Sequence, residues 1–333
     1  MKKILFNILK FSLFLSIGIF FIWLSVRKLS SDDIQHILDT RHNVNYFWIS
    51  AAVISGILSH IFRTLRWIQL LETLGKKPRF INTLGAVFIG YFANLAIPRL
   101  GEASRCGVLT KFEDIPFNKS FGTVITERLI DMLCFVIVFF LTLLFEFKLL
   151  YNLFNQYVLI PIAEKFNAGG TLTLVLLLGL LLLLGLIAFV LVKKYLRNLY
   201  DKLFDFIKGL TEGLKSLFVI KRPFLFLSYT FGIWFMYFLM AYFSLICLPE
   251  TRHLGLTAGL AVLAFGSIGI MVSAGGIGAY PYFTKITLLL FLIPENIGLA
   301  VGWVSWSLQT IILIIFGIIA LIVLPMINNT NKV

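Results

Sequence analysis

The sequence predicts an all-α polytopic membrane protein with about six full membrane spans and two oppositely oriented re-entrant helical hairpins. Of its 333 residues, 59% are hydrophobic and 14% are charged, and the mean hydropathy is +0.94. A soluble domain carries about 25% charged residues. Several apolar windows reach the ~20 residues that a transmembrane helix needs. Two further apolar runs break off at proline, glycine or charged residues, which hydrocarbon tolerates only where protein encloses the break.

The first two spans are predicted at Ile4–Leu24 and Tyr46–Ile61, joined by an outer loop over residues 30–45. The first run is too long for a signal-peptide core and lacks a small-residue cleavage site, so a retained span is favoured over a cleaved signal. After the second span, basic residues outnumber the single acid, Glu72. An excess of positive charge places a short loop in the cytosol. The basic residues are Arg63, Arg66, Lys76, Lys77 and Arg79.

The first break follows the apolar run Phe80–Ile97, which enters from the cytosolic side. The next helical stretch, residues 103–112, covers only ~15 Å, half of a ~30 Å hydrocarbon core. The chain must therefore turn back to the cytosol as a re-entrant hairpin. A full span follows at Ser120–Phe145.

The middle of the chain is predicted to contain a span at Leu172–Val192 and a basic cytosolic segment at residues 193–222. Apolar residues recur at helical spacing among the lysines and arginines of that segment. Such a pattern is typical of an amphipathic helix on the inner leaflet, although a plain connecting helix with a solvated face gives the same pattern. Phe224–Leu248 then crosses outward.

The second break lies at residues 273–281, between the apolar runs Leu254–Val272 and Tyr282–Ile293. The second run is again too short to cross, so this hairpin is predicted to enter from outside, and Ile297–Leu324 makes the last span. Two oppositely oriented hairpins, each followed by a full span, follow the logic of inverted-repeat transporters. We expect one integral membrane domain over residues 1–333, in the cell membrane, with both termini cytosolic.

Charged residues gather around the first break and in the span after it. Buried charges in a membrane normally face a cavity or each other. Glu127 and Asp131 share one helix face, so a cation is expected between them, and Arg99 and Arg105 are the natural partners. Arginines suit a lipid phosphate, so one interpretation of these residues is a headgroup-binding site. The alternative is an ion-pair cluster with a purely structural role. The candidate substrate-binding residues here are Asn94, Arg99, Glu102, Arg105, Glu127, Arg128 and Asp131.

The second break supplies Gly275, Gly276 and Gly278 as further candidates. Glycines permit a tight turn and leave N–H groups at the start of the next half-helix, where an anion is favoured. Close helix packing is the alternative reading of the same glycines. The sequence shows no metal-ligand spacing, and we expect neither a cofactor nor a catalytic residue. The excess positive charge lies in loops, where we expect it to set the orientation of the chain in the membrane and to contact anionic lipids of the inner leaflet. It does not indicate binding to nucleic acid.

Four motifs resemble the lysylphosphatidylglycerol synthase transmembrane-region family, whose members are also described as flippase-like. They are spread over nearly the whole chain in the order that the family shows. The resemblance implies lipid translocation, because in multidomain members a separate soluble domain makes the aminoacylated lipid and no such domain is expected here. The motifs are Arg63-x-x-Arg66-Trp67-x-x-Leu70-Leu71, Asn94-x-x-x-Pro98-Arg99-x-Gly101-Glu102-x-x-Arg105, Glu127-Arg128-x-x-Asp131 and Gly275-Gly276-Ile277-Gly278.

The favoured hypothesis is a flippase that moves a polar-headgroup lipid between leaflets through a site built on broken helices. The alternatives are a membrane enzyme acting on a lipid-linked substrate, with Glu127 or Asp131 as base, and a small-solute transporter. The expected partners are a membrane phospholipid or lipid-linked substrate, and a homo-oligomer is possible on this sequence.

Overall fold

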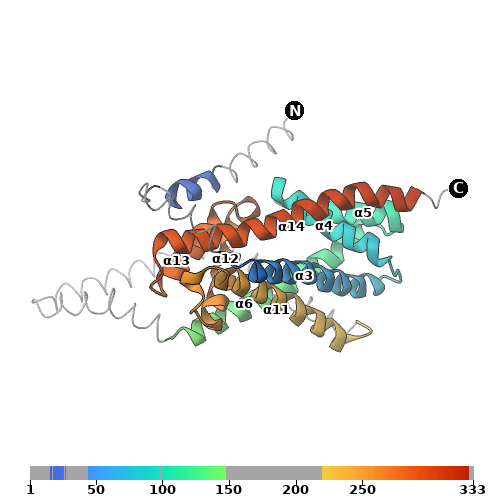
Figure 1. Cartoon of the computed structure of the whole chain (residues 1–333). Coiled ribbons are helices and arrows are strands. Elements are labelled where there is room, and N and C mark those ends of the chain that lie inside the picture. Colours follow the sequence, from blue (N-terminus) through green and yellow to red (C-terminus); the bar gives the residue numbers. More distant parts are fainter. Residues whose placement is uncertain are drawn as a thin grey trace, which may run out of the picture. The chain divides into compact units, whose positions relative to one another are not determined.

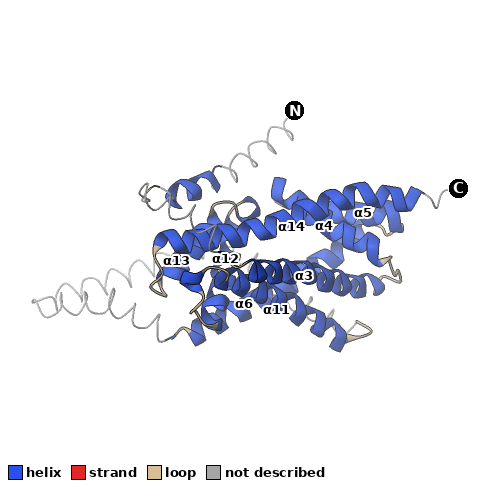
Figure 2. Cartoon of the chain, viewed as in Figure 1, coloured by secondary structure: helices blue, strands red, loops and turns tan. Residues whose placement is uncertain are grey.

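The computed structural model describes residues 44–97, 99–147 and 220–329, together with residues 16, 18–25 and 27. The chain divides into two compact units, residues 1–142 with 218–333 and residues 143–217, and only residues 143–147 of the second are described. The predicted span at 172–192, residues 193–219 of the basic segment, and most of the first span and outer loop lie outside the described residues. Figure 2 shows that the described regular structure is helical.

Eight α-helices lie within residues 44–329 of the described chain, and residues 18–25 are helical as well (Figure 1). They are α3 (Tyr46–Glu72), α4 (Phe80–Ala96), α5 (Leu100–Glu113), α6 (Phe117–Phe145), α11 (Pro223–Ile246), α12 (Leu256–Val272), α13 (Ala279–Leu289) and α14 (Glu295–Asn329). Short 3₁₀ turns lie at Pro249–Thr251 and Ala274–Gly276.

Four of these helices, α3, α6, α11 and α14, are long and apolar enough to cross a membrane. Large apolar side chains point outward from them, including Phe140 (62% exposed), Phe224 (83%) and Phe231 (70%). Charged side chains such as Arg66 and Glu127 are fully buried instead. Apolar groups outside and ion pairs inside reverse the pattern of a soluble protein. The chain is thus an all-α integral membrane protein, as the sequence predicts.

The predicted ends agree closely with the structure for α4, α6 and α12 but not for α3. The sequence places a cytosolic loop from Arg63 onward, whereas α3 continues to Glu72 and buries Arg63 and Arg66. The prediction of a span ending at Ile61 was wrong because it counted both arginines as loop charges. Carboxylates on another helix neutralise them, so the helix continues without exposing either charge.

The first hairpin consists of α4 and α5. At its open end, Glu113 accepts hydrogen bonds from Arg79 Nε (3.4 Å) and from the Asn82 amide. Near the turn the two helices almost touch, because a Cβ on Gly101 would lie 1.9 Å from the carbonyl oxygen of Gly90. Only glycine permits that approach.

The turn of this hairpin is narrow and exposed. Ile97 is extended and Arg99 adopts a left-handed conformation (φ 70°) before α5 begins. The Gly101 N–H donates to Asn94 Oδ1 (2.8 Å), which satisfies one of the free N–H groups at the start of α5.

The second hairpin consists of α12 and α13. Its turn contains Gly275, Gly276 and Gly278 at φ values of 58°, 77° and 69°. Residues with a Cβ rarely adopt these values, which explains the glycine run. The arms are close enough that a Cβ on Gly269 would lie 2.8 Å from the Tyr280 nitrogen.

The open ends of the two hairpins lie at opposite ends of α14. Asn328, near the C-terminus of α14, bonds Asn82 of the first hairpin (2.9 Å). Glu295, at its N-terminus, pairs with Lys285 of the second (2.8 Å). Helix α13 lies beside the N-terminal half of α14, and α4 lies beside its C-terminal half (Figure 1). This opposed arrangement fits the predicted re-entrant pair, whose sides of the membrane stay a prediction.

The turns of the two hairpins meet. A Cβ on Gly275 would lie 2.9 Å from the Leu95 Cδ2 methyl at the end of α4. Trp306 of α14 also contacts this turn, because its indole N–H donates a hydrogen bond to the Gly275 carbonyl (2.9 Å). The two breaks in hydropathy, far apart in the sequence, therefore share one region of the fold.

Candidate functional site

An ion cluster is formed by Arg63 and Arg66 from α3, Arg105 from α5, and Glu127 and Asp131 from α6. Its centre is a four-way contact between α3 and α6. Arg63 Nη1 lies 2.5 Å from Glu127 Oε1 and 2.6 Å from Asp131 Oδ2. Arg66 Nη2 lies 2.6 Å from Asp131 Oδ1 and 3.3 Å from Glu127 Oε1. Two guanidinium groups thus separate carboxylates that would otherwise repel each other.

Arg105 joins the first hairpin to this centre. Its Nη2 lies 2.7 Å from Glu127 Oε2, and its guanidinium stacks over the Trp67 ring at 4.4 Å. The Trp67 indole N–H donates to Thr123 Oγ1 (3.0 Å), which fixes the ring between α3 and α6. Arginines of two helices, α3 and α5, therefore converge on one carboxylate of a third, α6.

A second ion pair lies beside the ion cluster. Arg128 Nη2 is 3.0 Å from Glu102 Oε1, which again joins α6 to α5. The Arg128 side chain is 37% exposed, whereas those of Arg63, Arg66 and Arg105 are at most 3% exposed. Water therefore screens the outer pair far more than the ion cluster.

The ion cluster carries a surplus of positive charge. Three guanidinium groups face two carboxylates, so one positive charge remains. Among the described residues, Arg105 Nε and Nη1 and the Nε of Arg63 and Arg66 have no hydrogen-bond partner. Buried charges and donors are costly unless they are paired. Chemically, the arrangement suits an additional anion, and a phosphate presents several acceptor oxygens to such guanidinium donors.

Two tyrosine side chains, those of Tyr237 and Tyr91, lie beside Arg63. Tyr237 of α11 accepts a hydrogen bond from Arg63 Nη2 (3.2 Å), and the Tyr91 ring of α4 lies 5.5 Å from the guanidinium. His60, one turn earlier on α3, packs against the Phe88 and Tyr91 rings. Helix α4 thus contributes aromatic contacts rather than charge.

The structure brings together Glu102, Arg105, Glu127, Arg128 and Asp131, as the sequence analysis grouped them. It does not place Arg99 among them: Arg99 is exposed at the turn and has no ion pair within the described part of the chain. The cations between Glu127 and Asp131 come from α3 instead. Asn94 binds the hairpin turn. A role of these residues in substrate binding stays a prediction.

Gly275, Gly276 and Gly278 lie in the other hairpin, where two N–H groups donate to carbonyl groups of the same turn. Those of Gly276 and Ile277 donate to the carbonyls of Ser273 and Ala274 at 3.2 Å each. Segment 18–25 covers the same turn, since a Cβ on Gly278 would lie 2.5 Å from the Gly18 carbonyl oxygen. These contacts fit the alternative reading of the glycines, close packing, and their role in substrate binding stays a prediction.

Sequence reasoning missed Arg63 and Arg66 as members of the ion cluster. Their spacing of three residues puts them on one helix face, and the same is true of Glu127 and Asp131 at a spacing of four. Two such matched pairs, basic and acidic, were the available signal. Among the residues that the structure describes, no group of His, Cys, Asp or Glu is arranged to hold a metal ion.

Comparison with known proteins gives one family and two relatives. The family described as lysylphosphatidylglycerol synthase TM region matches residues 8–330. The UPF0104 membrane protein MJ1595 of Methanocaldococcus jannaschii is 26% identical over 336 residues, which cover 96% of each chain. Glycosyltransferase AglD of Haloferax volcanii is 31% identical over 86 residues, 26% of this chain and 14% of that protein. The comparison with solved structures gave no match.

The family match spans almost the entire chain, and the relative from Methanocaldococcus jannaschii is similar over the same extent. The family's region includes every helix described above, the ion cluster and both hairpins. The chain belongs to the lysylphosphatidylglycerol synthase TM-region family.

Proposed function

We propose that this protein moves a lipid with a phosphate-bearing headgroup between the two leaflets of the cell membrane. The observation that carries the proposal is the ion cluster: a net positive, largely buried group inside a bundle whose outer surface is apolar. A lipid crossing the membrane needs a polar path for its headgroup, since a bare charge in hydrocarbon is costly.

The position of Arg105 suggests how a headgroup could reach the ion cluster, namely by a movement of the first hairpin. Arg105 lies on α5, the second arm of the first hairpin, and reaches Glu127 on the long helix α6. A shift of this hairpin would release Arg105 from Glu127 and free its guanidinium for a headgroup phosphate. The opposed second hairpin would offer access from the other leaflet, in the manner of inverted-repeat transporters. On this proposal both hairpins are re-entrant and both termini are cytosolic.

A family name that refers to a lipid supports the proposal, but the synthetic reaction in that name is not carried over. The described residues of this chain form helices of a membrane domain. The proposed partners are a membrane phospholipid or a lipid-linked substrate.

The partial similarity to a glycosyltransferase favours a second candidate, a membrane enzyme that acts on a lipid-linked substrate. In that case Glu127 or Asp131 would act as the base. Both carboxylates are held by two or more guanidinium groups, an arrangement that stabilises the charged form and weakens a base. The translocation proposal is therefore preferred.

One experiment separates the two candidates. The purified full chain is reconstituted into liposomes that contain a headgroup-labelled phospholipid, and the label in each leaflet is followed with a membrane-impermeant quencher. The proposal expects leaflet exchange faster than in protein-free liposomes, with no change in lipid mass. A product of new mass would support the enzyme, and exchange at the protein-free rate for every phospholipid tested would contradict translocation.

A further inference from the structure

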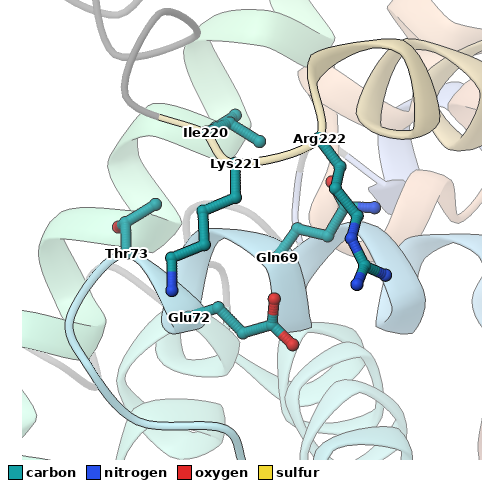
Figure 3. Close-up of a pocket in the computed structure, with 6 residues that line it drawn as sticks. All are labelled: Gln69, Glu72, Thr73, Ile220, Lys221 and Arg222. Carbon is teal, nitrogen blue, oxygen red and sulfur yellow. The ribbon is translucent and has the colours of Figure 1, made fainter.

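A small hollow lies where α3 ends and α11 begins, apart from the ion cluster. It is lined by Gln69, Glu72, Thr73, Ile220, Lys221 and Arg222. Figure 3 shows Lys221 and Arg222 extending from the loop before α11 toward the last turn of α3, where Gln69 and Glu72 lie. Two chain segments about 150 residues apart thus supply one polar pocket.

An unpartnered amide points to a ligand in this hollow. The Gln69 residue is 8% exposed, and neither its Nε2 nor its Oε1 has a hydrogen-bond partner within the described residues. A buried amide without partners costs free energy, so native structures nearly always satisfy it. The Gln69 Nε2 group can donate to an acceptor oxygen placed in the hollow.

The charges of the hollow define the ligand further. Lys221 and Arg222 contribute two positive charges and Glu72 one negative charge, which leaves a surplus of one. A phosphodiester carries a single negative charge and would neutralise that surplus. Arginine in particular binds phosphate through paired N–H groups.

The surface next to the hollow shows where such a phosphate would come from. Helix α11 begins at Pro223 and exposes Phe224, Leu227 and Phe231 at 83%, 55% and 70%. These residues follow Arg222 along the helix at spacings of two, five and nine, so a basic pair stands at the head of an apolar surface. Phosphate beside exposed apolar side chains is the chemistry of a phospholipid at the membrane interface.

We propose that this hollow is a binding site for the phosphodiester headgroup of an anionic phospholipid, with Gln69, Lys221 and Arg222 as its ligands. The site lies one helical turn from the ion cluster, because Gln69 follows Arg66 by three residues on α3. The inference does not depend on translocation and would hold equally for a membrane enzyme.

The test measures binding of short-chain phosphatidylglycerol to the purified full chain in detergent, by native mass spectrometry and by titration. The double variant Lys221→Gln/Arg222→Gln is expected to weaken binding about tenfold, because it removes two positive charges whose exposed side chains are partly screened by solvent. Gln69→Leu removes the amide without changing charge or much volume, and should weaken binding about threefold.

A matched control is Lys111→Gln/Lys119→Gln, which removes the same two charges from exposed positions on α5 and α6. It should bind phosphatidylglycerol as the unaltered protein does. Helicity and the thermal midpoint establish that each variant is folded. Because the control has the same net charge as the double variant, a loss confined to the latter locates binding at the hollow.

Two results would overturn the inference. Equal affinity of all variants, or equal loss in the control, would show that no specific site exists at the hollow. Displacement of phosphatidylglycerol by inorganic phosphate at millimolar concentration would show that the site takes free phosphate rather than a lipid. The inference expects neither, and expects retention of phosphatidylglycerol in the presence of inorganic phosphate.

Discussion

The two hairpins repeat one arrangement with different surroundings. In each, a buried cation on the second arm pairs with a glutamate on the long helix that follows: Arg105 with Glu127 at 2.7 Å, and Lys285 with Glu295 at 2.8 Å. The side chains of the two cations are 3% and 4% exposed. Helices α4 and α12, their first arms, are both 17 residues long.

The acids of these two pairs differ. Glu127 is fully buried in the first half of α6 and contacts three arginines, whereas Glu295 is the first residue of α14 and its side chain is 39% exposed. Water can screen and rehydrate the second pair but not the first. A buried ion pair at the end of a helix thus serves as an anchor, while a similar pair with a charge surplus inside the helix bundle is a candidate site.

The largest expected effect is the loss of stability when Glu127, rather than Glu295, is replaced. Glu127→Gln leaves three buried arginines with Asp131 as their one remaining carboxylate in the ion cluster, and should lower the free energy of unfolding by roughly 3–5 kcal/mol. Glu295→Gln should lower it by about 1 kcal/mol, because that side chain is part-exposed and the amide oxygen still accepts from Lys285. Thermal unfolding of both variants in one detergent checks the difference. Equal losses would contradict the distinction between site and anchor.

A smaller loss of stability is expected when a methyl group is placed between the two arms of the first hairpin. Gly101→Ala puts a methyl group 1.9 Å from the Gly90 carbonyl oxygen, so α4 and α5 must separate. A cost of about 3 kcal/mol is expected from such overpacking. Gly107→Ala on the same helix is the control, since a Cβ there meets nothing within 4 Å. An equal thermal midpoint for the two variants would mean that the arms are not in contact.

The smallest loss of stability is expected at the turn of the second hairpin. Gly278→Ala forces a Cβ onto a residue at φ 69° and toward the Gly18 carbonyl oxygen, and should cost roughly 1–3 kcal/mol. If the turn serves packing alone, lipid exchange by the folded variant stays within about twofold of normal, in line with the small effect of a site-remote change. A complete loss of exchange with an unchanged midpoint would return these glycines to the candidate site.

The sequence predicted the class of fold and most helix ends, because apolar runs and their breaks record where the chain lies in hydrocarbon. Phe117–Phe145 and Leu256–Val272 are examples. It misplaced the end of α3, because positive charge in a sequence does not tell whether a partner neutralises it. Arg63 and Arg66 resemble loop charges until α6 is packed beside them.

The candidate site was predictable in part for the same reason. Helical spacing put Glu127 and Asp131 on one face and required a cation between them. Which cation occupied that place depended on the packing of α3 against α6, which no local pattern records. Arg99 and Arg105 are equally plausible by spacing, yet only Arg105 faces the bundle, because the turn at Ile97 and Arg99 points Arg99 outward.

The central claim is that the ion cluster handles the headgroup while the Lys285 pair anchors a helix. The most direct measurement is phospholipid leaflet exchange in proteoliposomes by Arg105→Gln and Lys285→Gln, each shown to be folded by its thermal midpoint. The account predicts that Arg105→Gln slows exchange at least about tenfold, the size of one lost charge-assisted contact, and that Lys285→Gln stays within about twofold of the unaltered protein. Normal exchange by folded Arg105→Gln, or equal losses in both variants, would contradict it.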